Sequence, residues 1–95
     1  MLTSKQRAYL RGLANPMETI LQVGKGGVID TLVKQVDDAL TARELIKLRV
    51  LETAPQSARE TAVLLAEATH SDVVQVIGTR LVLYRPNPEK PVIQL

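Results

Sequence analysis

Apolar positions recur with two different periods along the chain, and the changes of period separate predicted helices from predicted strands. Thr3-Ser4-Lys5-Gln6 has the spacing of a capping box, and residues 6, 9, 10 and 13 then recur at helical intervals up to Asn15-Pro16. A stripe at positions 29, 32, 33, 36 and 40 predicts a second helix. Ser57-Ala58-Arg59-Glu60 repeats the capping-box spacing and predicts a third.

A half-exposed strand is predicted between the second and third helices. Residues 45–51 alternate, with apolar side chains on one face. Lys47 and Arg49 lie on the other face, two residues apart and therefore side by side.

Three further segments complete a predicted sheet. Residues 19–23 are short and rich in β-formers, and residues 73–77 and 80–85 are separated by Gly78-Thr79, the two-residue spacing of a hairpin. The predicted order is α-β-α-β-α-β-β. This order indicates an α/β fold with a mixed four-stranded sheet, helices mainly on one face and some sheet surface left open.

One domain is expected to span residues 1–86, a length that can bury a single core. Prolines at 86, 88 and 91 exclude a central strand after it, so residues 87–95 are predicted to form an extended tail. No run approaches the roughly 18 apolar residues of a membrane span. We therefore expect a soluble, cytoplasmic monomer.

Composition removes several classes of function. The chain has no Phe or Trp and only two Tyr, which argues against an RNA surface built on stacked aromatic rings. It has no cysteine, so disulfides, thiolate catalysis and Cys-based zinc sites are excluded. No bound metal or cofactor is expected.

Charge is unevenly distributed although the net charge is only +2. Residues 1–29 carry four cations against one carboxylate, residues 30–72 carry five against eight, and residues 73–95 carry three against one. If the two ends meet in space, they form a cationic face. Scattered solubilising charge would give the same counts.

The glycine-rich loop Gly24-Lys25-Gly26-Gly27 lies between a predicted strand and a predicted helix. Free backbone N–H groups, a helix N-terminus and a cation together favour an anion such as phosphate. The spacing fits neither a Walker A loop nor a dinucleotide fingerprint. Gly-x-x-Gly remains, which in KH-type modules lets a nucleic-acid backbone approach closely. An ordinary tight turn is the alternative.

Other cations could converge near this loop from the first helix, the open sheet face and the hairpin. They are Lys5, Arg7, Arg11, Lys47, Arg49, Arg80 and Arg85. Catalysis has little support in the sequence, because His70 falls at a predicted helix end and Asp37-Asp38 diverge on their helix. No nucleophile accompanies either, and we expect no enzymatic activity.

Several separate segments resemble the CRM domain family in its stand-alone bacterial, YhbY-type form. They run through nearly the whole chain in the family's order: residues 2–6, 10–16, 23–28, 44–48, 74–78 and 81–86. The resemblance implies a fold similar to the C-terminal domain of bacterial translation initiation factor three. It also implies RNA binding by the Gly-x-x-Gly loop and the strand lysine, Lys47, and an association with precursors of the large ribosomal subunit. The modest net charge departs from more basic members.

The resulting hypothesis is an RNA-binding protein that acts in ribosome biogenesis on rRNA or pre-large-subunit particles. It would hold the RNA backbone through Gly24–Gly27 and the adjoining basic surface. A protein–protein adaptor or regulator that uses the open sheet face and the Pro-containing tail is the alternative.

Overall fold

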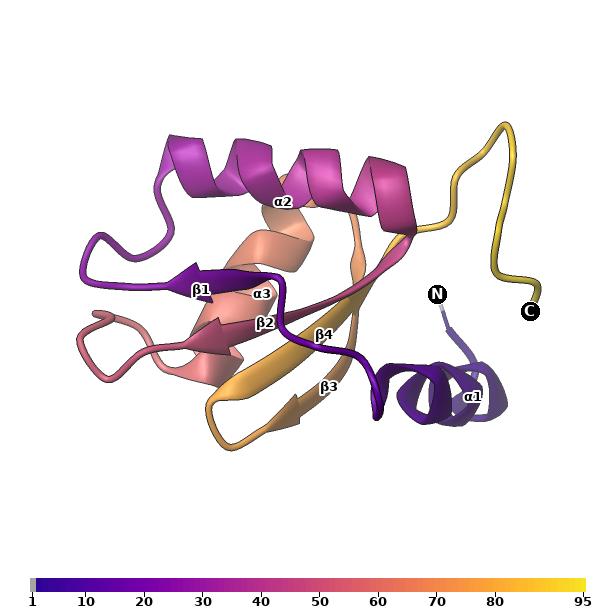
Figure 1. Cartoon of the computed structure of the whole chain (residues 1–95), viewed down its shortest axis with the longest axis horizontal. Helices are drawn as coiled ribbons and strands as arrows, with labels where there is room; N and C mark the ends of the chain where they lie inside the picture. The colour runs from indigo at the N-terminus through magenta and orange to yellow at the C-terminus, as the bar shows by residue number, and fades with distance from the viewer. Residues whose placement is uncertain (1) are drawn as a thin grey trace.

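Within residues 2–95, which the computed structural model describes, the chain forms its elements in the predicted order. They are α1 (Ser4–Ala14), β1 (Leu21–Val23), α2 (Asp30–Arg43), β2 (Leu45–Val50), α3 (Ala58–Thr69), β3 (Asp72–Ile77) and β4 (Arg80–Tyr84) (Figure 1). Met1, which the predicted domain of residues 1–86 includes, lies outside the described residues. The α/β class and the element order are confirmed.

The four strands form one mixed sheet in the order β1-β2-β4-β3. Strand β1 pairs in parallel with β2, and β4 lies antiparallel to both β2 and β3. The predicted two-residue hairpin joins β3 to β4, and Gly78 in its turn has a φ of +57° that suits glycine. The sheet thus combines a parallel crossover with a hairpin, as predicted.

Both predicted capping boxes are present. In α1 the Thr3 hydroxyl accepts from the Gln6 N–H at 3.1 Å while the Gln6 side chain accepts from the Thr3 N–H at 3.0 Å. Ser57 and Glu60 make the same reciprocal pair at α3, which ends at His70 in the left-handed region. The expectation that Ile29 belongs to the helical stripe of α2 is wrong. Ile29 is the extended N-cap of α2 and is 51% exposed.

The helices divide between the two faces of the sheet. Helices α2 and α3 pack on one face, where Leu40, Ile46 and Leu65 are fully buried in the larger core. Helix α1 packs on the other, where Leu10 and Ala14 form a smaller core cluster with strand residues. We call this second face, which carries Lys47 and Arg49, the α1 face. Because α1 covers only part of it, the end of the α1 face nearest the hairpin stays open (Figure 1).

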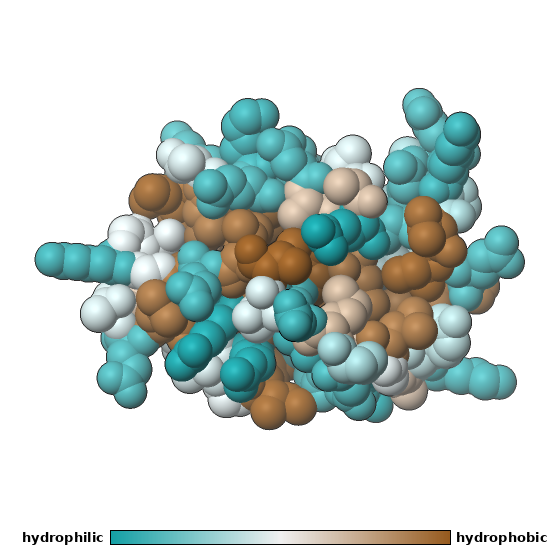
Figure 2. Space-filling model, in the orientation of Figure 1, coloured by the Kyte–Doolittle hydropathy of each residue, from teal (hydrophilic) through white to brown (hydrophobic). Residues whose placement is uncertain are grey.

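The tail that follows β4 is fixed to the domain by one buried carboxylate. Glu44 is 1% exposed and accepts hydrogen bonds from the N–H groups of Asn87 at 2.6 Å, Val92 at 2.7 Å and Ile93 at 2.8 Å. Burial alone would raise the pKa of Glu44, but these three N–H donors lower it, and the net pKa lies below its ordinary value. Hydrophobic surface gathers where the tail and α1 lie, at the right of Figure 2.

Candidate nucleic-acid interface

Three loops meet at one end of the sheet. Because β1 and β2 are parallel, the loops of residues 24–29 and 51–57 leave the sheet at the same end. The β3–β4 hairpin turns there as well, since Arg80 pairs with Arg49 near the end of β2. These loops lie on the left of Figure 1. They bring the glycine-rich loop and part of the predicted basic surface to one place.

The fold itself requires glycine at position 27. Gly27 has a φ of +67°, and its N–H donates to the Gly24 carbonyl oxygen at 2.9 Å to close a turn. A Cβ added here would lie 2.6 Å from Gln56 Oε1 and 2.7 Å from Pro55 Cγ. Gly27 therefore lets the glycine-rich loop pack directly against the β2–α3 loop.

The other two loop glycines have no such internal reason. A Cβ on Gly24 would meet Leu51 Cδ1 at 3.9 Å, and one on Gly26 would meet Ile29 Cδ1 at 3.6 Å. Both are ordinary van der Waals distances, and neither residue has a positive φ. Side chains would fit at both positions. Their absence leaves bare backbone on either side of the exposed Lys25.

Helix α2 begins beside this loop without a side-chain cap, unlike α1 and α3. Its N-cap residue, Ile29, has no polar side-chain atom, so no side chain accepts from the N–H groups of the first turn. These donors and the positive end of the helix dipole favour an external acceptor. Asp30, in the same turn, already supplies one negative charge there.

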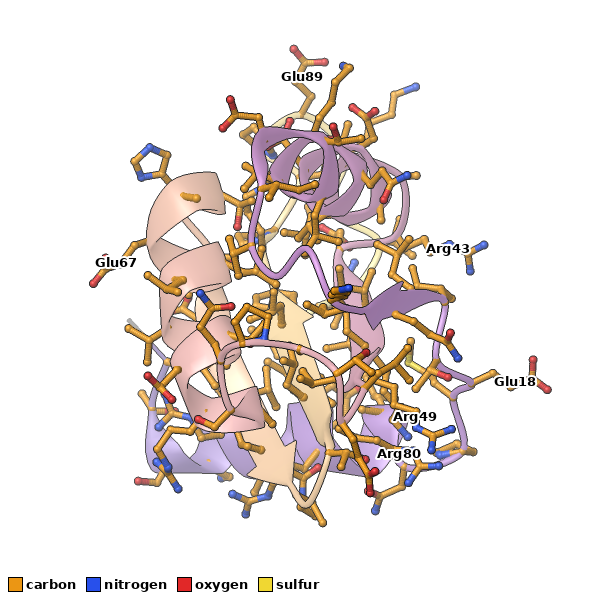
Figure 3. The ribbon with its side chains drawn as sticks, turned by 90° about the vertical axis from the view of Figure 1, so that its left-hand side faces the viewer. Glu18, Arg43, Arg49, Glu67, Arg80 and Glu89 are labelled. Atoms are coloured by element: carbon orange, nitrogen blue, oxygen red, sulfur yellow. The ribbon has the colours of Figure 1, made fainter. Side chains whose placement is uncertain are left out.

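Two arginines are direct neighbours across the sheet. Arg49 and Arg80 are register partners on β2 and β4, and both side chains are exposed on the α1 face. Figure 3 shows them pointing to the same side of the molecule as Glu18. Neither arginine forms an ion pair within residues 2–95. Like charges directly opposite each other destabilise a sheet, so this pair is suited to an anion between them.

Lys47 lies one step farther along the same face. It is half-buried, and its Nζ donates to the Asn15 carbonyl oxygen at 3.3 Å, which ties the end of α1 to β2. Lys47 and Arg80 also share the walls of two adjoining hollows. The predicted side-by-side placement of Lys47 and Arg49 is confirmed by their positions in the register.

The cations of α1 lie at increasing distance from this surface. With a rise of about 1.5 Å per residue, Arg11 lies roughly 6 Å along the helix axis from Asn15, and Arg7 roughly 12 Å. Lys5 lies at the far end of the helix, beside the tail residues Gln94 and Leu95. Arg11 is thus the α1 cation nearest to Asn15 and Lys47, but α1 as a whole lies on the opposite side of Figure 1 from the loops, so none of its cations is brought to them.

The structure does not bring Arg85 to this end at all. Its guanidinium donates to Asp37 Oδ1 at 2.6 Å, to the Thr69 carbonyl oxygen at 2.8 Å and to Thr41 Oγ1 at 2.9 Å. It also donates to the Asp37 carbonyl oxygen at 3.0 Å. These contacts join the last turns of α2 to the end of α3. Arg85 therefore has a structural role, and we leave it out of the interface.

Replacing Arg85 with methionine is expected to lower the free energy of unfolding by about 1–3 kcal/mol, because several acceptors lose a charged donor at once. Urea denaturation followed by circular dichroism measures this. Arg59→Met, at an exposed position on α3, is the matched control and should change stability little. Equal stability of the two variants would contradict the structural role of Arg85.

Two polar residues near the arginines were not selected from the sequence. The sequence pattern indicates only a helix end at Asn15 and part of a strand at Gln75. Both line the smaller hollow with Lys47 and Arg80. The available signal was Gln75 itself, the one polar side chain inside the apolar run 73–77.

Two other types of site, a metal centre and a membrane-spanning helix, find no support in the part of the chain that the structure describes. Residues 2–95 contain no group of three or more His, Cys, Asp or Glu side chains placed to hold a metal ion. None of the described helices is long and apolar enough to cross a membrane. The loop end of the sheet is therefore the strongest candidate for a functional surface.

The chain is similar to known proteins along nearly its whole length. Residues 2–85 match the family model described as the CRS1 / YhbY (CRM) domain. "Probable RNA-binding protein YqeI" of Bacillus subtilis is 44% identical over 95 residues, which cover 100% of this chain and 99% of that protein. "RNA-binding protein" of Haemophilus influenzae is 32% identical over 88 residues, with 93% and 89% coverage. The solution structure of the hypothetical protein SAV1595 of Staphylococcus aureus superposes with a TM-score of 0.84 at 48% identity, and covers 100% of this chain and 99% of its own. With a matching family model, matching relatives and a matching fold along nearly its whole length, the chain belongs to the CRS1/YhbY (CRM) domain family.

Proposed function

We propose that this protein is a non-catalytic RNA-binding protein that holds the RNA backbone at the loop end of its sheet. One observation carries the proposal: Gly24 and Gly26 lack side chains that the fold would accept. A phosphate can therefore approach the bare backbone and the uncapped start of α2, with Lys25 beside it. The names of the Bacillus and Haemophilus relatives, which describe RNA-binding proteins, support RNA as the polyanion.

The arginine pair extends this surface across the sheet. In our proposal Arg49 and Arg80 share a second phosphate, and Lys47 holds a neighbouring one. Bound phosphate would also relieve the repulsion between the two register partners. Because these contacts reach backbone rather than base edges, they give affinity without sequence preference.

Large-subunit assembly is the cellular role that we propose, as a monomer in the cytoplasm. The support comes from the resemblance to bacterial CRM-domain proteins. The sheet surface and the tail that the adaptor alternative would use are both engaged within the domain. The apolar part of the α1 face is covered by α1 and the tail, and the tail is hydrogen-bonded to Glu44.

Lys25→Ala combined with Lys47→Ala is expected to weaken binding to a structured RNA hairpin by roughly tenfold at moderate salt and to lower the slope of log affinity against log salt by about two. The reason is the loss of two counterion-releasing contacts. Fluorescence anisotropy over a salt series measures both quantities. Lys34→Ala combined with Lys90→Ala removes the same charge from exposed positions elsewhere and should leave the slope unchanged.

The same two double variants test the cellular role in sucrose gradients of cell lysate. At low salt the unmodified protein and the control should sediment with large-subunit or precursor particles, and high salt should release them. The Lys25/Lys47 variant should stay at the top. If the unmodified protein stays at the top at low salt, the ribosomal role fails. If the slope of log affinity against log salt is unchanged in the Lys25/Lys47 variant, the proposed binding site is wrong.

A further inference from the structure

Two neighbouring hollows lie on the open part of the α1 face, beside the C-terminal end of α1. The smaller has a volume of about 120 Å³ and is lined by Asn15, Lys47, Gln75, Ile77, Arg80 and Val82. The larger, about 350 Å³, is lined by Met17, Glu18, Thr19 and the same two cations. Lys47 and Arg80 therefore stand between two concave surfaces.

The smaller hollow combines three kinds of chemistry. Val82, 2% exposed, and Ile77, 63% exposed, provide apolar surface. The amides of Asn15 and Gln75 are the uncharged polar groups, and neither side chain hydrogen-bonds to another residue of the described chain. Each amide offers one acceptor and two donors. Lys47 and Arg80 supply the positive charge.

A β-bulge directs Gln75 into this hollow. The β3–β4 register shifts between Val73 and Gln75, so that Val73 pairs with Leu83 while Gln75 pairs with Val82. Val73 packs on the larger core, whereas Gln75 lies on the α1 face. Bulges commonly re-aim a side chain beside a functional site. Here the bulge places a polar side chain in the same hollow as Asn15, the C-cap residue of α1.

This combination suits a nucleobase attached to a phosphate backbone. Paired donors and acceptors on an amide match base edges, apolar side chains pack against the base, and cations hold the adjoining phosphates. A base stacked inside a duplex cannot enter a hollow between a helix end and a sheet, because it must first leave the stack. The fitting ligand is a nucleotide without a pairing partner.

We propose that this hollow binds one unpaired nucleotide of RNA, with its base between the amides of Asn15 and Gln75 and its phosphates at Lys47 and Arg80. The inference rests on the proposed function and deepens it. The preferred RNA becomes a helix interrupted by a bulge or loop rather than an uninterrupted duplex. Gly24–Gly27 and Arg49 then hold the neighbouring backbone.

Three matched RNA hairpins test this inference: one fully paired, one with a single bulged adenosine, and one with an abasic site at the bulge. The unmodified protein should bind the bulged hairpin roughly tenfold more tightly than the paired one, the difference that one bidentate amide–base contact can supply. The abasic hairpin should bind like the paired one. If it binds like the adenosine hairpin, the preference comes from bending and the inference is wrong.

Asn15→Ala combined with Gln75→Leu should abolish the preference while keeping the affinity for the paired hairpin. Gln35→Leu, on the exposed side of α2, is the control and should keep the preference. If the Asn15/Gln75 variant still prefers the bulged hairpin to the paired one, the proposed nucleotide pocket is wrong. Equal binding of all three hairpins by the unmodified protein also overturns it, but leaves the proposed function standing if that binding is salt-dependent. Absence of salt-dependent binding to any hairpin is the separate failure of the proposed function.

Discussion

Glu44→Ala is expected to lower the free energy of unfolding by about 2–4 kcal/mol and to free the tail, because three N–H groups of the tail lose their charged acceptor together. In the structure the carboxylate is the shared partner of Asn87, Val92 and Ile93. Urea denaturation gives the stability, and amide hydrogen exchange at residues 87–95 reports the tail. Glu89→Ala removes an exposed carboxylate from the same segment and should change neither.

The contribution of Glu44 should also depend on pH. Its folded pKa lies below the ordinary value of 4.5, so the stabilisation is complete above about pH 4.5 and is lost as the pH falls through the folded pKa. The stability difference between the unmodified protein and Glu44→Gln should therefore shrink on acidification below that value. A difference that stays constant from pH 7 to pH 3 would show that the charge of Glu44 is not what holds the tail.

Alanine substitutions should separate the three glycines of the loop into two classes. Gly27→Ala is expected to cost about 1–3 kcal/mol of stability, because its Cβ would overlap Pro55 and Gln56 at a positive φ. Gly24→Ala combined with Gly26→Ala should leave stability nearly unchanged. It should weaken RNA binding by roughly tenfold, since the new methyl groups stand where phosphate approaches.

Thermal melting and anisotropy on the same samples distinguish the two classes. Gly12→Ala is the matched control: nothing lies within 4 Å of its added Cβ, and it should raise stability slightly through helix propensity without changing RNA affinity. Unchanged RNA affinity in the Gly24/Gly26 variant would contradict the loop as the phosphate site. Unchanged stability in Gly27→Ala would contradict its packing against the β2–α3 loop.

Local sequence signals predicted the elements well because they depend on local interactions. Capping boxes form within four residues, and the alternation in 45–51 requires only the pleat of one strand. The same reasoning explains the error at Ile29. An apolar residue at the correct spacing looked like part of the helical stripe, although it precedes the helix in extended backbone.

What could not be predicted depends on contacts between distant segments. Arg85 counted as one more cation until α2 and the end of α3 supplied its acceptors. Glu44 carried no signal, since its donors lie more than 40 residues later in the chain. Gln75 reached the α1 face only through a bulge, which simple alternation does not reveal. The sequence could predict which charged residues are candidates for the site. It could not predict which of them the fold would engage in internal hydrogen bonds and ion pairs.

The division of charge between the faces has a consequence for how the protein meets a polyanion. The outer surfaces of α2 and α3 expose five carboxylates (Asp30, Asp37, Asp38, Glu60 and Glu67) against three cations (Lys34, Arg43 and Arg59). The open part of the α1 face instead presents Arg49 and Arg80 beside Glu18 (Figure 3). This separation gives the molecule a permanent dipole moment. The electric field of an approaching polyanion exerts a torque on this dipole and turns the protein during diffusion. A larger fraction of encounters therefore begins in the productive orientation. A small net charge is thus compatible with fast association.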